Sequence, residues 1–252
     1  MKNSKLTYFI VLIFISSSIL IYSFSKSSNT PNYAINNSAG FTQDEIAKGL
    51  KEALSVGTDS AVKRLAKMDG FYKDAALKIL LPPEAKDIIK YKDKVPGLAP
   101  LVKEMELRLN RSAEDAVVTA APIFKDAIVK MTITDGINIL KGNKNAATLY
   151  LKGKTSSQLV TAFSPKVKTS LDKPLVGNLS ASGSWLKITT LWNKYAGSTA
   201  GQILGVKKVN SDLTNYVTTK AVSGIFVKVE EQEAKIRTNL NYQVTDLLQK
   251  LF

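Results

Sequence analysis

Two side chains that carry much of protein chemistry are absent from this chain of 252 residues, which has no cysteine and no histidine. Without cysteine there is no disulfide, no thiolate nucleophile and no site for attaching a lipid to a cysteine. Without histidine there is no imidazole base near neutral pH, and the most common metal ligand is missing. These absences exclude histidine-based serine or cysteine catalysis and zinc sites built from histidine or cysteine. Enzymes that use only carboxylates, lysine or tyrosine stay possible.

Arginine is also scarce. The chain has 35 basic and 21 acidic residues and a net charge of +14, and only four of the basic residues are arginine, which leaves 31 lysines. Nucleic-acid-binding proteins rely on arginine for bidentate and stacked contacts, so we predict no nucleic-acid partner. The lysines are spread along the chain, which favours a solvated basic surface. Attraction to an anionic membrane or envelope polymer is the alternative.

The longest uncharged run lies near the start of the chain. Twenty residues separate Lys5 from Lys26, and the stretch Leu6–Phe24 is mostly apolar. As a helix, a segment of this length reaches roughly 30 Å, the thickness of a bilayer core. Basic residues before it hold its start in the cytoplasm, so we predict that the rest of the chain is exported to the periplasmic side. Ser23 and Ser25 also permit cleavage, which leaves a membrane anchor and a cleaved signal peptide both open.

The remaining sequence divides by composition. Residues 1–25 form the signal or anchor segment, residues 26–40 are a polar tether rich in Ser and Asn, and residues 41–252 are long enough for one domain with its own core. Apolar residues recur at helical rather than strand spacing over most of this last part. We therefore predict an all-α, single multi-helix domain after the N-terminal apolar segment, with no cofactor and no metal site.

The first expected helix is Phe41–Lys67, in which Thr42 and Glu45 have the spacing of a capping box. Gly57 marks a possible break within it. An Asp69-Gly70 turn follows, and then Phe71, which we expect in the core. Further helices are expected from Glu84 onward and at Leu101–Ala120, Ile123–Met131, Gly136–Leu140, Ala146–Lys152, Thr155–Leu171 with an interruption at Pro165, Trp185–Tyr195, Asp212–Leu240 and Val244–Phe252, with the main loop at Asp172–Ser184 and short strands conceivable only at Val176–Asn178 and Leu186–Thr190.

Several short pieces, taken in order, resemble a bacterial family of unknown function, domain of unknown function (DUF) family 4197. These pieces are Gly49–Leu54, Asp69–Phe71, Asn110–Glu114, Pro122–Phe124, Asp135, Ile139–Gly142, Ala146–Thr148, Tyr150, Tyr216–Val217, Gly224–Phe226 and Ile236–Arg237. No single piece is specific, but their number and order are, and they cover nearly the whole expected domain. The resemblance implies a helical, often exported protein and brings no activity with it.

One candidate ligand or partner patch lies in the helix expected at Leu101–Ala120. Asn110, Arg111 and Glu114 fall within about one helical turn, and Arg111 can pair with Glu114 at i,i+3. Upstream, Glu104 and Arg108 have i,i+4 spacing. The alternative interpretation is a network of salt bridges that only packs the helix.

Two further groups have a functional and a structural interpretation. Trp185, Trp192 and Tyr195 share nearly one helical face. They form an aromatic binding patch, touch a membrane interface, or belong to the core. The carboxylates Glu230, Glu231 and Glu233 near Arg237 fit either acid–base chemistry or an exposed charged face.

The function predicted from the sequence is an exported, membrane-tethered helical protein that has a non-enzymatic binding role in the cell envelope. Its partners would be the membrane, through the N-terminal segment, and an envelope protein or lipid. Two alternatives stay open, a helical carrier of a lipid or other apolar ligand and a carboxylate-based hydrolase of envelope polymers.

Overall fold

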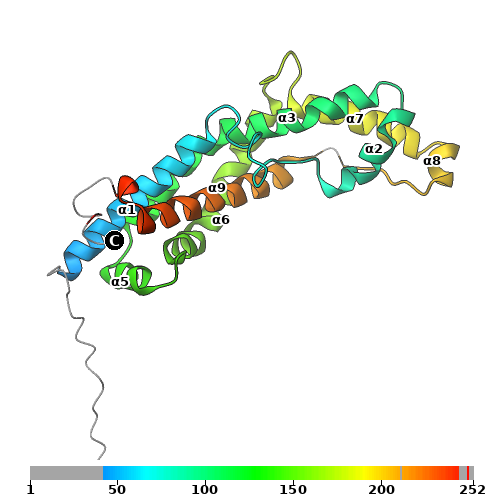
Figure 1. Cartoon of the computed structure of the whole chain (residues 1–252). Coiled ribbons are helices and arrows are strands. Elements are labelled where there is room, and N and C mark those ends of the chain that lie inside the picture. The colour runs from blue at the N-terminus through cyan, green and yellow to red at the C-terminus, as the bar shows by residue number, and fades with distance from the viewer. Residues whose placement is uncertain (1–41, 211, 244–248, 250–252) are drawn as a thin grey trace, which may run out of the picture. The chain divides into compact units, whose positions relative to one another are not determined.

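Figure 1 shows the computed structural model of the chain, which describes residues 42–210, 212–243 and 249. Throughout these residues the regular elements are helical, which confirms the all-α prediction. The α-helices are α1 (Gln43–Leu65), α2 (Lys86–Tyr91), α3 (Leu98–Ala116), α4 (Ala120–Val129), α5 (Ile133–Lys141), α6 (Ala146–Asp172), α7 (Ala181–Ala196), α8 (Thr199–Ile203) and α9 (Thr214–Thr238). Short 3₁₀ turns lie at Pro83–Ala85, Lys92–Lys94, Val117–Thr119 and Leu240–Tyr242.

Several predictions fall outside the described residues. These are the segment Leu6–Phe24, the tether at 26–40 and most of the helix expected at Val244–Phe252. The described residues all belong to one compact unit, which contains the core residues named below. Among the helices that the structure describes, none combines the length and the apolar character needed to cross a bilayer.

Helix α1 begins as its sequence predicts. The Thr42 hydroxyl accepts a hydrogen bond from the Glu45 backbone N–H, and the Glu45 carboxylate accepts one from the Thr42 N–H, so the capping box is confirmed. The break expected at Gly57 was wrong, because α1 runs through it without interruption. Gly57 is buried against α9, where an added Cβ would lie 3.5 Å from Ile236. A small residue at this point lets the two helices pack closely.

The prolines that were expected to end or interrupt helices lie within α3, α4 and α6. Pro100 and Pro122 are the third residues of α3 and α4, where the backbone N–H has no partner within the helix in any case. The helices expected at Ala146–Lys152 and at Thr155–Leu171, the second interrupted at Pro165, form one continuous helix, α6. Pro165 lies on its exposed side. Because water can hydrogen-bond the carbonyl that the proline leaves without a partner, the helix continues.

Three boundaries also differ from the sequence prediction. Helix α5 begins at Ile133, because Thr132 and Asp135 form a second capping box. The loop expected at Asp172–Ser184 is shorter, since α6 ends at Asp172 and Ser180 caps α7. This loop holds an isolated bridge between Val176 and Leu179, and the other strand candidate, Leu186–Thr190, is part of α7.

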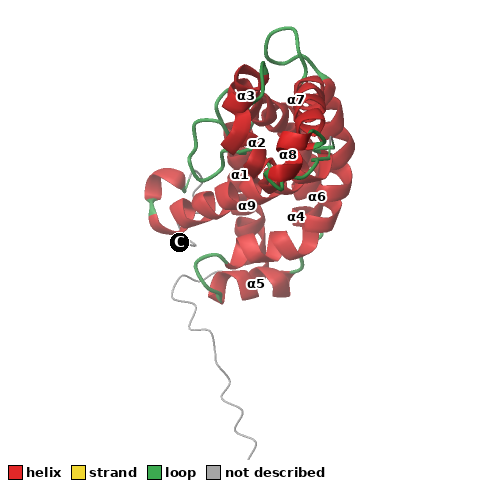
Figure 2. Ribbon diagram, turned by 90° about the vertical axis from the view of Figure 1, so that its right-hand side faces the viewer, coloured by secondary structure: helices red, strands yellow, loops and turns green. Residues whose placement is uncertain are grey.

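The helices pack around one main core. Helix α6 contacts α9, α3 and α4, helix α1 contacts α9, α4 and α5, and α7 lies along α3, as the view in Figure 2 also shows. The largest fully buried side chains are aromatic: Phe71, Phe124, Phe163, Trp185 and Trp192. The rings of Phe124 and Phe226 meet edge to face with centroids 6.0 Å apart. Phe71 was expected in the core and is fully buried, with its ring against Gly224 of α9.

Candidate functional site

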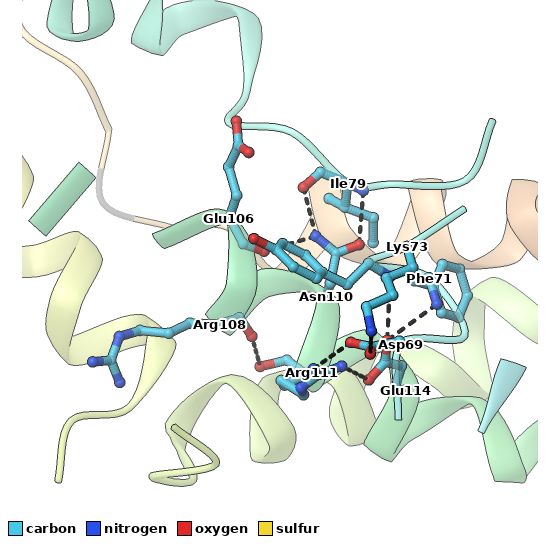
Figure 3. Close-up of polar contacts among 11 residues, drawn as sticks. Asp69, Phe71, Lys73, Ile79, Glu106, Arg108, Asn110, Arg111 and Glu114 are labelled. Carbon is cyan, nitrogen blue, oxygen red and sulfur yellow. Dashed lines mark hydrogen bonds and ion pairs between the residues drawn. The ribbon is translucent and has the colours of Figure 1, made fainter. Parts of the chain in front are cut away.

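The candidate patch on α3 faces another part of the same chain. Asn110 is completely buried and binds the backbone of Ile79, in the extended segment between α1 and α2 (Figure 3). Its Oδ1 accepts from the Ile79 N–H at 2.9 Å, and its Nδ2 donates to the Ile79 carbonyl at 2.8 Å. Nδ2 also donates to the Glu106 carbonyl within α3. The Asn110 amide thus satisfies both backbone groups of Ile79, as a paired strand would.

Glu114 and Arg111 hold the preceding turn in the same way. Glu114 Oε1 accepts from the backbone N–H groups of Phe71 and Tyr72 at 3.1 and 3.3 Å, and its Oε2 lies 2.5 Å from Arg111 Nη1. The other Arg111 nitrogen, Nη2, donates to Asp69 Oδ1 at 2.6 Å. Asp69, Arg111, Glu114 and the turn therefore form one connected network (Figure 3).

The network carries a local conformational strain. Asp69 has φ +69°, a left-handed conformation that is uncommon outside glycine. Hydrogen bonds from Lys73 and then from Arg111 hold the pKa of the Asp69 carboxyl below its ordinary value of 3.8. The ionised carboxylate is thus the form that the turn stabilises.

In this geometry the polar groups of Glu114 and Asn110 already have hydrogen-bond partners within the chain. Both oxygens of Glu114 are engaged, one by two backbone N–H groups and the other by Arg111, and the Asn110 amide is engaged at both ends. A general acid or base must instead reach a substrate proton. What Asn110, Arg111 and Glu114 do in the structure is to clamp the segment between α1 and α2 onto α3. We call these three residues and Asp69 the α3 clamp.

Arg108 fastens α3 to a second loop. Its guanidinium donates to the carbonyls of Val176 and Leu179 and pairs with Glu104 at 2.7 Å, so the predicted i,i+4 pair forms. The Arg108 side chain points away from the α3 clamp (Figure 3). The loop between α6 and α7 is thereby tied to the middle of α3.

Trp185 and Trp192 are fully buried and do not form a surface patch. Each indole N–H has a backbone partner, Trp185 the carbonyl of Asn210 at 3.0 Å and Trp192 the carbonyl of Lys207 at 2.9 Å. Tyr195 is half-buried, and its ring lies 5.6 Å from that of Trp192. The core-packing interpretation accounts for both tryptophans, because each packs its ring in the core and satisfies its polar end.

The expectation of an exposed face at the end of α9 was wrong for Glu233. This carboxylate is buried and accepts hydrogen bonds from the backbone N–H groups of Ala147 and Thr148, at the first turn of α6. It also forms an ion pair at 2.9 Å with Arg237, which lies four residues later on the same helix. A carboxylate at a helix N-terminus satisfies N–H groups that have no partner within the helix, so Glu233 caps α6 from a distance.

One buried charge was missed in the sequence. Lys228 of α9 is 2% exposed, and its ammonium lies 2.6 Å from both Asp74 and Glu231. The hydrogen bond from Lys228 is the main cause that lowers the pKa of Asp74 below 3.8. The helical spacing could have predicted this burial, because Lys228 lies seven residues after the core residue Ala221 and therefore on the same side of the helix.

The chain matches one known protein family over most of its length. The model described as "Protein of unknown function (DUF4197)" matches residues 40–252. The chain belongs to this family. The resemblance read from the sequence is thus confirmed, and the residues of the α3 clamp all lie inside the matched region of this DUF4197 protein. No curated protein matches the chain, and no solved structure does.

Proposed function

We propose that this DUF4197 protein is exported, tethered to the membrane by its N-terminal segment, and acts in the cell envelope by binding rather than by catalysis. The observation that carries the first part is the uncharged run of twenty residues between Lys5 and Lys26, which includes the mostly apolar stretch Leu6–Phe24 and is followed by a polar tether. The second part rests on how the structure uses its carboxylates.

The buried carboxylates of the domain support a binding role. Glu114 and Glu233 are engaged by backbone N–H groups and by arginine, which makes them structural. Where neighbouring groups shift the pKa of an aspartate, as at Asp69, Asp74 and Asp135, the shift is downward. A general acid for hydrolysis needs the opposite shift, so these groups do not favour the hydrolase alternative.

The interior also argues against the carrier alternative. A cavity between α1 and α9, lined by Leu50, Leu54, Val229 and Ile236 among others, has a volume of about 30 Å³. That is room for one water, whereas sites for drug-sized ligands measure about 300–1,000 Å³. Larger hollows of about 560, 480 and 360 Å³ are open to the surface, and each has charged side chains in its lining, such as Asp59 and Lys125 in the groove between α1 and α4.

A topology experiment tests the export step. The full chain carries a C-terminal reporter enzyme that is active only after export, and intact cells are assayed for it. We expect activity from the native chain and its loss when Leu12 and Ile15 are both replaced by arginine, whereas the replacement of both by alanine keeps it. Equal activity of the arginine variant would overturn the proposal. The mass of the mature protein from the membrane fraction decides between an anchor and a cleaved signal.

A further inference from the structure

The positive charge of the chain is concentrated in one part of it. Residues 136–229 contain thirteen lysines and only two carboxylates, Asp172 and Asp212, whereas an even spread of the 21 acidic residues would place about eight there. Residues 42–135 contain 16 basic and 15 acidic residues. The lysines are spread along the chain, as the sequence showed, but the acids that would neutralise them are not. This excess of +11 accounts for most of the net charge of +14.

Six of the thirteen lysines lie in α6 and α7, and Lys207 and Lys208 follow α8. Helices α6, α7 and α8 follow one another, α6 packs against α7, and α7 packs against α8. Twelve of the thirteen lysines are exposed, and Lys228 is the buried exception. No carboxylate occurs in α7, in α8 or in α6 before Asp172. Among the described residues, Lys187, Lys194, Lys207 and Lys208 have no acidic partner within ion-pair distance.

Side chains of α7 fix part of this surface in place. Trp185 and Trp192 donate to the carbonyls of Asn210 and Lys207, and Asn193 both donates to the Val209 carbonyl and accepts from its N–H at 2.8 Å. The segment 207–210 is therefore bound along α7 by three side chains. Val209 packs toward the core while Lys207 and Lys208 are exposed. The two ammonium groups are thus presented on a fixed backbone.

Apolar side chains are exposed beside these lysines. Ile203, the last residue of α8, is 80% exposed, and Leu204 after it is 42% exposed. The chain then turns at Gly205, where φ is +65°. We call Ile203, Leu204, Lys194, Lys207 and Lys208 the α7–α8 tip. Helix α8, which ends at Ile203, lies at one end of the group of helices in Figure 1.

The side chains of the α7–α8 tip favour one kind of binding partner. Aliphatic side chains next to lysines suit a bilayer interface, where the apolar groups enter the acyl boundary and the ammonium groups stay among anionic headgroups. Nucleic acid is a poorer fit, because residues 136–229 contain no arginine and both tryptophans are buried. We propose that the α7–α8 tip, with the basic surface of α6 and α7, binds an anionic lipid surface. This inference rests on the proposed function, since the tether holds the domain near a membrane.

The absence of cysteine makes a direct test possible. The full chain with Ile203→Cys is labelled with an environment-sensitive dye and reconstituted through its N-terminal segment into vesicles that contain a lipid-borne quencher. In phosphatidylglycerol vesicles we expect quenching at least threefold stronger than in phosphatidylcholine vesicles. In about 0.5 M NaCl, where the Debye length falls to about 4 Å, we expect the difference to disappear.

A matched control position separates docking from mere proximity. Val129 is the last residue of α4 and is 64% exposed, but it lies in the charge-balanced part of the chain. A dye on Val129→Cys should not be quenched more in anionic vesicles. In the Ile203→Cys background, the pairs Lys207→Glu with Lys208→Glu and Lys187→Glu with Lys194→Glu should each remove most of the difference. Helical circular dichroism confirms that each variant is folded.

Three results would overturn the proposal: equal quenching in neutral and anionic vesicles, equal quenching at positions 129 and 203, and an unchanged signal in both charge-reversed pairs. Competition by soluble polyphosphate at the same phosphate concentration as the lipid would also overturn it, because the occupant would then be an anionic polymer. The vesicle test does not depend on export. Its failure and a failure of the topology experiment are therefore distinguishable.

Discussion

Residues 42–135 and residues 136–229 use their charges in opposite ways. In the first region 16 basic residues meet 15 acidic ones, and several of them are turned inward to hold backbone. In the α3 clamp, Arg111 bridges Asp69 and Glu114, and Glu114 binds two backbone N–H groups. In the second region thirteen lysines meet two acids, and twelve of those lysines are exposed.

Charged side chains of the first region stabilise the fold, whereas those of the second region are exposed at the surface and available for binding. A buried ion with a full set of partners costs much to disturb, because removing one partner strands the other away from water. An exposed lysine is solvated with or without a partner, so it contributes little to stability. Substitutions in the two regions should therefore differ mainly in the free energy of unfolding.

The largest effect is expected at Glu114. Replacing Glu114 by alanine leaves Arg111 with only Asp69 and leaves the Phe71 and Tyr72 N–H groups without their acceptor. We expect the free energy of unfolding to fall by about 4 kcal/mol, as for the loss of one partner of a buried ion pair. Urea unfolding of the domain, followed by circular dichroism, measures it.

An exposed ion pair gives the control for this substitution. Asp126 and Lys130 of α4 pair at 2.7 Å with side chains that are 52% and 70% exposed. Replacing Asp126 by alanine should change the unfolding free energy by less than about 0.5 kcal/mol. If both alanine variants lose the same small amount, the α3 clamp is not what holds the turn.

A smaller loss is expected from Asn110→Ala. The substitution removes both hydrogen bonds to Ile79 and leaves its buried N–H and carbonyl without partners. With one to three kcal/mol for each unsatisfied group, partly relieved by water, we expect a loss of about 3 kcal/mol. Hydrogen exchange at the Ile79 amide should also become faster than at core amides of α6. Unchanged protection of that amide would contradict the assigned role.

The smallest effect is expected in the second region. Lys194, Lys207 and Lys208, changed together to glutamine, should leave the unfolding free energy within about 0.5 kcal/mol of the native value, because their ammonium groups are solvated. The same triple variant should lose the anionic-lipid response of a dye at position 203. A stability loss comparable to that of Glu114→Ala would remove the contrast between the two regions.

Much of the fold was predictable from local sequence. Thr42 and Glu45 announced the start of α1, and the apolar spacing indicated helices throughout the domain. The predictions at Gly57 and Pro165 were wrong because the effect of each residue depends on its surroundings, which the sequence does not show. Gly57 packs closely against α9, and Pro165 faces water.

The candidate patch was found, but its role was not. Spacing along one helix put Arg111 and Glu114 together, because i,i+3 neighbours are fixed by the helix itself. Their long-range partners, Asp69 and the backbone of residues 71 and 72, lie about forty residues earlier, and no local pattern connects them. Glu233, which caps α6 from α9, was misread for the same reason.

The helical class, the family and the charge excess of residues 136–229 follow from composition, spacing and motif order, which are local properties of the chain. Which charges are buried depends on the folded arrangement of the helices. This arrangement buries Glu114, Glu233 and Lys228 among partners from distant segments and leaves Lys207 and Lys208 exposed on a backbone held by α7. The reason is physical: burial and partners depend on which helices meet, and that is decided by packing across the whole domain.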